Sequence, residues 1–334
     1  MTMMLRKTFI AAALGALVLP ALAQAPAGVN AEAFKQLSDD KFTIISPFPP
    51  GGPVDTLARV MAEGLSKRYG QPAVVDNAPG AAGNIGMDKV KRAKPDGHTL
   101  LLIPAGNLTI NPTLMPNFPF KVEKDFAAVT MLAKAPNVLV AAPSSGIKNA
   151  KDLVAQAKAK PGTLSYASPG IGSGLHLAGE LFKQHTGTDL LHVAYKGTGP
   201  AMNDVLGGTV PLMFTNLPAA LPHLAAGKLV ALGITEAQRT PVAPNIPTLA
   251  EQGIQGVNVT SWYGMLAPAG TPEVVVQQLA RDASDFLSQP EVKERLKAQG
   301  MTQSTMAPAA FAKYIKDETA VWAGVIQSRQ IKAE

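Results

Sequence analysis

The sequence predicts an α/β protein built from two units, each with a largely parallel sheet covered by helices. Three observations support this fold class. Short apolar runs alternate with helical patterns along the whole chain. Four of the strand-to-helix junctions are Gly/Pro-rich turns. Two long extended segments, near residues 131–140 and 257–266, separate one unit from the other.

The first 23 residues have the pattern of a secretory signal. Arg6 and Lys7 precede an apolar stretch at 8–19, and the small-residue box Ala21-Leu22-Ala23 follows. The apolar stretch is too short to span a membrane, although an uncleaved anchor is the alternative. We expect cleavage after Ala23 and export to the periplasm.

Composition excludes several classes of protein. The chain has no cysteine, so it has no disulfide, thiol nucleophile or cysteine-ligated metal. Its 334 residues, 46% of them hydrophobic, suffice for two cores. The formal charge of +6 comes without any basic run, which indicates no nucleic-acid partner and at most a mild attraction for anions.

The first unit reads as strand–helix–strand–helix–strand. Its expected elements are a strand at 42–45, a helix at about 55–69, a strand at 73–75, a helix at 84–93 and a strand at 99–103. Leu57, Val60, Met61 and Leu65 fall on one face of the first helix. The last strand is almost wholly apolar, as expected for a parallel strand covered on both faces.

The second unit follows a long predicted strand at 127–142, and Asn149 is the expected N-cap of its first helix. Its expected elements are a helix to 160, a strand at 164–167, a helix at 175–185, a strand at 190–195, a helix at 200–206, a strand at 210–214, a helix to 227 and a strand at 229–234. Three final helices are expected at 272–287, 290–299 and 308–329.

Because the chain crosses between units twice, one unit must be made from two segments. We expect residues 24–133 plus 258–334 to form lobe 1 and residues 134–257 to form lobe 2. Ligands of open α/β sheets bind beyond the carboxyl ends of the strands. The four turns lie at such ends, two in each lobe, so they predict a cleft that closes about the crossings.

The four turns lie at residues 49–53, 77–83, 168–174 and 196–200. A helix that begins at such a turn presents unpaired N–H groups and partial positive charge to an anion. The backbone candidates for ligand binding are Gly51, Gly52, Gly80, Ala81 and Ala82. The alternative is that these glycines serve only turn geometry.

Side-chain candidates follow the same strands. Asn107 follows the strand at 99–103, and Ser168 and Ser173 flank the third turn; Ser173 could instead be only an N-cap. His176 either faces the ligand or lies behind the cleft.

Four further side chains are weighed, Tyr195 and Lys196 at the end of a strand and Trp262 and Tyr263 on the second crossing. Tyr195 is expected to reach the cleft more readily than Lys196, whose amine snorkels to water. Trp262 and Tyr263 either pack at the hinge or form an aromatic wall.

Neither a metal nor a cofactor is expected. His98, His185, His192 and His223 lack a zinc-binding spacing. The glycines at 80–86 lack the acidic partner and context of a dinucleotide loop, and there is no Gly-Lys-Ser/Thr phosphate loop.

The ordered motifs resemble those of the substrate-binding proteins of tripartite tricarboxylate transporters, the Bug-type family. The first is Val54-Asp55-Thr56-Leu57-Ala58-Arg59 after Pro50-Gly51-Gly52. The others lie at 77–86, 94–100, 166–168, 172–180, 192–197, 216–218, 227–229, 247–251, 261–264 and 267–272. Each motif is weak alone, but together they span essentially the whole mature chain.

The resemblance implies a type II periplasmic-binding-protein-like fold, with two α/β lobes joined by two hinge crossings. It implies capture of a small organic acid, a di- or tricarboxylate or an aromatic carboxylate, and its delivery to membrane permease subunits. It also implies a carboxylate held by main-chain amides, hydroxyls and water. We expect a monomer that is not an enzyme.

Two positions depart from the family pattern. Val54 stands where Ser or Thr is frequent, and Phe214-Thr215-Asn216 stands where Phe-Asp-Asn is frequent. With Thr215 in place of a carboxylate, we expect a neutral wall that disfavours ligands with an amino group. Val54, Asp55, Thr215 and Asn216 complete the set of expected ligand-binding residues, although Asp55 and Arg59 also have the i, i+4 spacing of a local ion pair.

Two other functions are considered. A ligand-loaded sensor for a membrane kinase would share the fold. An exported hydrolase would need a Gly-x-Ser-x-Gly elbow, which Ser173 lacks because Gly172 directly precedes it.

Overall fold

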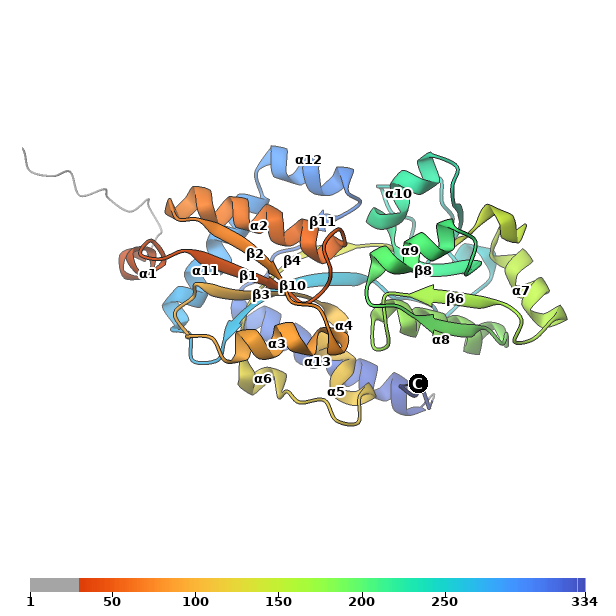
Figure 1. Ribbon diagram of the computed structural model, residues 1–334, viewed down its shortest axis with the longest axis horizontal. Helices are drawn as coiled ribbons and strands as arrows, with labels where there is room; N and C mark the ends of the chain where they lie inside the picture. The colour runs from red at the N-terminus through yellow and green to blue at the C-terminus, as the bar shows by residue number, and fades with distance from the viewer. Residues whose placement is uncertain (1–29, 329, 334) are drawn as a thin grey trace, which may run out of the picture.

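The computed structural model describes residues 30–328 and 330–333, so the predicted signal and its cleavage site lie outside the described residues. The described chain forms two mixed α/β sheets that lie side by side (Figure 1). The six-stranded sheet has the order β11-β4-β10-β3-β1-β2, and the five-stranded sheet has the order β7-β6-β8-β5-β9. We call each sheet with its helices the first unit and the second unit.

The first sheet combines early and late parts of the chain. Its strands are β1 (Phe42–Ser46), β2 (Ala73–Asn77), β3 (Thr99–Pro104), β4 (Phe126–Ala135), β10 (Ser261–Pro268) and β11 (Thr302–Gln303). β1 pairs in parallel with β2 and β3, whereas β10 lies antiparallel between β3 and β4. A strand from late in the chain therefore lies inside a sheet begun by the first residues described.

Helices cover both faces of the first sheet. One face carries α1 (Ala31–Leu37), α2 (Pro53–Tyr69), α11 (Glu273–Leu287) and α12 (Pro290–Ala298). The other carries α3 (Asn84–Lys91), α4 (Ala105–Thr109), α6 (Val122–Asp125) and α13 (Pro308–Ser328). α2 begins at Pro53, earlier than predicted, because proline suits the first helical position, and it ends at Gly70 in the left-handed conformation.

The second sheet is continuous in sequence. Its strands are β5 (Asn137–Ala141), β6 (Ser165–Ser168), β7 (Leu191–Ala194), β8 (Leu212–Asn216) and β9 (Val230–Ile234). One face is covered by α7 (Ala150–Ala159) and α8 (Gly174–Thr186), and the other by α9 (Thr198–Leu206) and α10 (Leu217–Ala225). Asn149 caps α7 as predicted, since its Oδ1 accepts a 2.9 Å hydrogen bond from the Asp152 N–H.

The predicted strand at 127–142 is two strands, β4 and β5, separated by Pro136. Proline has no N–H for the ladder, so the strand ends there and the chain passes from the first sheet to the second. The short elements α1, α4, α5 (Asn111–Leu114), α6 and β11 were not predicted, because so few residues carry no readable periodicity.

The two crossings between the units are tied together. The first is at Pro136, and the second leads from the end of β9 to β10. Asn137 Nδ2 donates to the Val259 carbonyl (2.9 Å), which also accepts from Thr235 Oγ1 (2.6 Å). Buried hydrogen bonds therefore join the outgoing crossing to the returning one.

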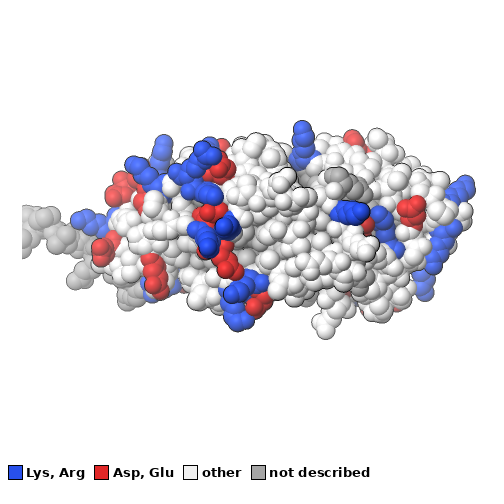
Figure 2. Space-filling model, turned by 90° about the horizontal axis from the view of Figure 1, so that it is seen from below, with Lys and Arg blue, Asp and Glu red and all other residues white. Residues whose placement is uncertain are grey.

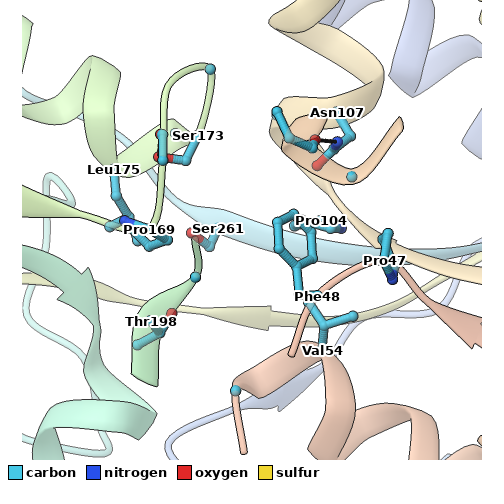
Figure 3. Close-up of a pocket in the computed structure, with 18 of the residues that line it drawn as sticks. Pro47, Phe48, Val54, Pro104, Asn107, Pro169, Ser173, Leu175, Thr198 and Ser261 are labelled. Atoms are coloured by element: carbon cyan, nitrogen blue, oxygen red, sulfur yellow. Dashed lines mark hydrogen bonds between the residues drawn. The ribbon is translucent and has the colours of Figure 1, made fainter. Parts of the chain in front are cut away.

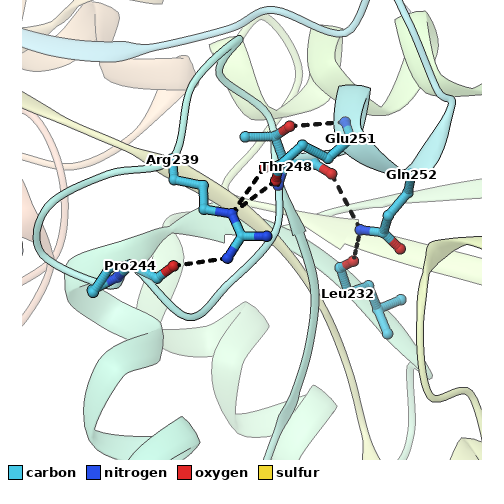
Figure 4. Close-up of polar contacts among 6 residues, drawn as sticks. All are labelled: Leu232, Arg239, Pro244, Thr248, Glu251 and Gln252. Carbon is cyan, nitrogen blue, oxygen red and sulfur yellow. Dashed lines mark hydrogen bonds and ion pairs between the residues drawn. The ribbon is translucent and has the colours of Figure 1, made fainter.

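The returning connection is itself ordered by polar contacts (Figure 4). Arg239 Nε donates to the Glu251 carboxylate (2.9 Å), and its Nη1 donates to the Pro244 carbonyl (2.9 Å). Gln252 Nε2 donates to the Leu232 carbonyl (2.7 Å), which fixes the connection to β9. The segment has little regular structure but is held against the second unit.

The last helix contacts both units. α13 packs against β4, α4 and α5 of the first unit. Near its end, Trp322 and Val325 pack against the core of the second unit, and Ile326 joins a cluster with Ile110 and Leu177, one from each unit. The end of α13 is thus a third connection between the units.

Charges are dispersed on the surface. On the face seen in Figure 2, acidic and basic side chains intermingle toward both ends and the centre is largely uncharged. No helix among residues 30–328 has both the length and the apolarity needed to cross a membrane.

Candidate functional site

A pocket of about 700 Å³ lies between the two units. Its walls come from the loops after β1, β2 and β3 of the first unit and after β6 and β7 of the second, and all four predicted turns contribute. Figure 3 shows Val54, Pro104 and Asn107 on one side, Ser173 and Thr198 on the other, and Ser261 between them. The site therefore lies beyond the carboxyl ends of the parallel strands.

Apolar groups make up most of the pocket wall. Its prolines are Pro47, Pro49, Pro50, Pro53, Pro79, Pro104, Pro169 and Pro200. Phe48, Val54, Ile171 and Leu175 add larger apolar side chains. Prolines carry no N–H, so the backbone donors at the pocket come from the glycines, alanines and other residues between them. The pocket suits a ligand with an apolar body.

The donors that remain are concentrated at helix starts. α2, α8 and α9 begin at the pocket, with Gly52, Ser173 and Gly197 as their N-cap residues. N–H groups of a first turn have no intrahelical partner, and the helix dipole adds positive character there. Ser173 Oγ accepts from the His176 N–H (3.1 Å), so Ser173 acts as the N-cap that was one of its two predicted roles.

The second turn has an unusual backbone. Ala81 and Ala82 have φ values of 47° and 53°, in the left-handed region that alanine rarely adopts. Asn107 Nδ2 donates to the Ala82 carbonyl (2.7 Å), as the dashed line in Figure 3 shows. Asn107 therefore lines the pocket as predicted, with its amide nitrogen holding the turn.

Nine predicted residues line the pocket, namely Gly52, Val54, Gly80, Ala81, Ala82, Asn107, Ser173, Tyr195 and Asn216. Five others are not lining residues, namely the exposed Gly51 and the buried Asp55, Ser168, His176 and Thr215. For Gly51, Asp55 and His176 this favours the alternatives stated from the sequence, and for Ser168 and Thr215 the expectation that they face the cleft is corrected.

Asp55 braces the first turn from behind. Its Oδ2 accepts from the Gly51 N–H (3.1 Å) and from Arg59 Nε (3.1 Å), and its Oδ1 accepts from Asn77 Nδ2 (3.1 Å). Burial raises the pKa of this carboxyl, but these hydrogen bonds and the Arg59 charge outweigh burial and leave the pKa below its ordinary value. The Gly51 N–H and the Asp55 carboxylate are therefore hydrogen-bonded to each other within the turn.

Ser168 and His176 belong to a buried cluster under the third turn. Ser168 Oγ lies 2.7 Å from His192 Nε2, and the His192 ring stacks on His176 with centroids 4.3 Å apart. His176 Nδ1 accepts from the Gly172 N–H (3.4 Å). Burial lowers the pKa of His176 to about 4 and that of His192 to about 3, with positive neighbours adding to the effect, so both rings are neutral at pH 7.

Thr215 lies fully buried on β8, one residue before Asn216. Successive side chains of a strand point to opposite faces, so only one of the two can face the pocket, and it is Asn216. Thr215 therefore does not form part of the pocket wall and does not make that wall neutral.

Tyr195 and Lys196 both line the pocket, although Tyr195 alone was favoured. Tyr195 Oη donates to Asp204 Oδ2 (2.6 Å), so its hydroxyl faces its own unit. Burial and the Asp204 carboxylate raise the pKa of Tyr195 to about 12. The Lys196 side chain is exposed at the rim, as expected from snorkelling.

The polar lining residues outside the predicted set include Asn111 and Glu318, and Tyr263, weighed only as packing or as an aromatic wall, also lines the pocket. Tyr263 is 2% exposed and Asn111 is 2% exposed. In the described part of the chain, neither Tyr263 Oη nor Asn111 Oδ1 has a hydrogen-bond partner. Glu318 also lines the pocket, and its Oε2 accepts from Trp262 Nε1 (2.7 Å). Tyr263 thus combines the two predicted alternatives, since it packs at the crossing and also forms part of the wall.

Among residues 30–328 and 330–333, no group of three or more His, Asp or Glu side chains could hold a metal ion. The lining residues offer backbone N–H and carbonyl groups, hydroxyls, side-chain amides, the Glu318 carboxylate and the amine of Lys196 at the rim.

Comparisons with known proteins agree with this geometry. Residues 57–331 match the family model described as "Tripartite tricarboxylate transporter family receptor". The chain is 39% identical to Protein BugT of Bordetella pertussis over 290 residues. The aligned region covers 86% of this chain and 89% of BugT.

Two solved structures are similar over nearly their whole length. One, described as a periplasmic transporter, is 40% identical with a TM-score of 0.84 and covers 89% of this chain and 99% of that one. The other, R. palustris Rpa4515 with adipate, is 34% identical with a TM-score of 0.85. The match covers 88% of this chain and 98% of that chain.

Proposed function

The chain belongs to the tripartite tricarboxylate transporter receptor family, and from this premise we propose that it captures a small organic carboxylate and delivers it to a membrane transporter of that type. The family comprises periplasmic solute-binding receptors, which bind and do not catalyse. The capture site in this proposal is the pocket between the two units.

The observation that carries the proposal is the convergence of three helix starts on one pocket. α2, α8 and α9 direct first-turn N–H groups toward it from both units. An anion between these termini gains hydrogen bonds and dipole stabilisation from both sides. The bound adipate of the R. palustris relative supports a carboxylate as that anion.

We assign lobe 1 to residues 24–133 plus 258–334 and lobe 2 to residues 134–257, with the crossings as the hinge. Close contacts between the units support a closing motion. Gly106 lies so near Gly172 that an added Cβ would be 2.4 Å from the Gly172 carbonyl oxygen. We also infer that residues 1–23 direct export to the periplasm.

The proposal is tested with purified mature protein. Native mass spectrometry first identifies any ligand that copurifies. After its removal, a thermal-shift screen compares dicarboxylates, tricarboxylates and aromatic acids with sugars and cations. A carboxylate at a hundred times its Kd should stabilise the fold by about 2.7 kcal/mol.

An optical readout gives a second measure of binding. The chain has two tryptophans. Trp322 lines the pocket, and Trp262 bonds to Glu318, which also lines it. Binding should therefore change the intrinsic fluorescence. A melting temperature raised by sugars or cations and by no organic acid would contradict carboxylate capture.

A further inference from the structure

The pocket has two chemically different sides, and the central strand β10 separates them. Trp262 and Tyr263 are adjacent on this strand, so their side chains point to opposite faces of the first sheet. Tyr263 packs in the core shared with α2 and α11, whereas Trp262 packs in the core shared with α4 and α13. Figure 1 shows α2 and α9 above the two sheets and α13 below them.

The side of Tyr263 offers donors. Tyr263 Oη is buried at the pocket and has no partner in the described chain. A phenol hydroxyl donates one hydrogen bond, and leaving it unmade in a buried site is costly. α2 and α9 begin on this side, with their free N–H groups and positive dipole ends. A ligand carboxylate fits here.

The side of Trp262 differs in that it carries acceptors, beside the start of α8 and its free N–H groups. The Glu318 carboxylate lines the pocket and accepts from Trp262 Nε1 (2.7 Å), and Thr109 and Trp322 are further hydrogen-bond partners. No Lys or Arg lies within ion-pair distance of it among the described residues, although Lys134 acts on it through space. Asn111 Oδ1, also buried at the pocket, has no donor in the described chain.

A second ligand carboxylate on this side would meet the Glu318 carboxylate in a partly buried setting, where repulsion between like charges is strong. An O–H or N–H group there would instead donate to the Glu318 carboxylate or to Asn111 Oδ1, which has no donor in the described chain. Selection by repelling the wrong group as well as bonding the right one is a general route to specificity.

We propose that the pocket is polarised and takes a monocarboxylate with a hydroxyl or amino donor at its far end, with Glu318 as the residue that sets this specificity. The inference rests on the proposed carboxylate capture and narrows its ligand class. It also revises the expectation of a neutral wall, because Glu318 supplies the carboxylate that Thr215 does not.

The test uses four six-carbon acids that differ only at the far end, namely 6-hydroxyhexanoate, 6-aminohexanoate, hexanoate and adipate. Their Kd values are measured by titration calorimetry on the ligand-free mature protein. We expect at least one donor-bearing acid to bind ten times more tightly than adipate. In E318Q this preference should shrink at least tenfold, because the neutral amide does not repel a second carboxylate and its Nε2 donates to one.

Two further variants separate the roles. D317N removes the same charge from the next residue of α13, whose side chain is 59% exposed and paired with Lys313, so the preference should stay unchanged. Y263F should weaken all four acids by about tenfold without changing their ranking. Circular dichroism confirms that each variant is folded.

The outcomes distinguish the inference from its premise. Adipate bound by the wild type as tightly as either donor-bearing acid, or a preference that E318Q leaves unchanged, would overturn the polarised pocket and leave carboxylate capture standing. If no carboxylate binds here or in the thermal-shift screen, both proposals fail.

Discussion

Asn216 donates a 2.8 Å hydrogen bond from its side-chain amide to Oδ1 of Asn137. The first residue lines the pocket at the end of β8, and the second begins β5 immediately after the outgoing crossing. The same Asn137 oxygen accepts from Ser261 Oγ (2.8 Å) at the start of β10. The side-chain amide of Asn137 therefore joins Asn216, at the pocket, to both crossings.

Replacing Asn137 with alanine should lower the free energy of unfolding by roughly 2–3 kcal/mol, because it leaves Asn216 Nδ2 and the Val259 carbonyl without this partner. Urea denaturation measures the change. Asn149→Ala is the matched control, since it removes an exposed N-cap worth about 1 kcal/mol. Equal losses in the two variants would contradict a special role for Asn137.

Gly106→Ala should weaken ligand binding about tenfold or more, because the new methyl would hold the units apart at Gly172. Calorimetry gives the Kd, and small-angle scattering gives the radius of gyration, which should be larger with ligand than that of the wild type. Gly324→Ala, on an exposed turn of α13 with open space around it, should leave both values unchanged. Wild-type affinity in the Gly106 variant would show that the close contact is dispensable.

Asp55→Asn should destabilise the protein more than Arg59→Gln. The Arg59 side chain is 59% exposed, so its pair contributes only about 0–1 kcal/mol. The Asp55 carboxylate also holds the Gly51 N–H and Asn77 and should contribute about 1–3 kcal/mol. The lowered pKa means that this stability is present above about pH 3.8 and is lost below it. Urea titrations of both variants at pH 7 decide the order.

Stability should fall as the pH drops from about 6.5 toward about 4. The folded protein keeps His176 and His192 neutral, with pKa values of about 4 and about 3, while the unfolded chain binds protons near 6.5. Each histidine then contributes a slope of up to about 1.4 kcal/mol per pH unit. His176→Gln, which keeps an acceptor for the Gly172 N–H, should flatten the profile. Identical slopes in the two proteins would refute this assignment.

The sequence indicated the alternation of strands and helices well, because each depends on local signals. The apolar run at 99–103 forms β3, and the helix predicted to end at 69 is α2, which does end at Tyr69. The strand predicted at 127–142 was wrong at Pro136, where the choice between one strand and two depends on which sheet each half joins. Such pairing is a long-range property that no local pattern carries.

The pocket could be predicted only where backbone turns form it. Gly80, Ala81 and Ala82 line it because a turn fixes their position locally. Thr215 was misplaced and His176 was left between two positions, because the direction of a side chain depends on the packing around it. Glu318 lies more than 50 residues beyond Trp262 on the final helix, and only the folded chain brings the two together.

The position of β10 bears on the order in which the two units can form as the chain is synthesised. The second sheet draws all its strands from one uninterrupted stretch of chain, so it can assemble as soon as that stretch emerges. The first sheet must wait, since β3 and β4 meet through a strand that begins only at Ser261. A chain cut short before that residue would keep a whole second sheet and a divided first one. The cleft would then have only one finished wall, so the ability to bind is acquired last.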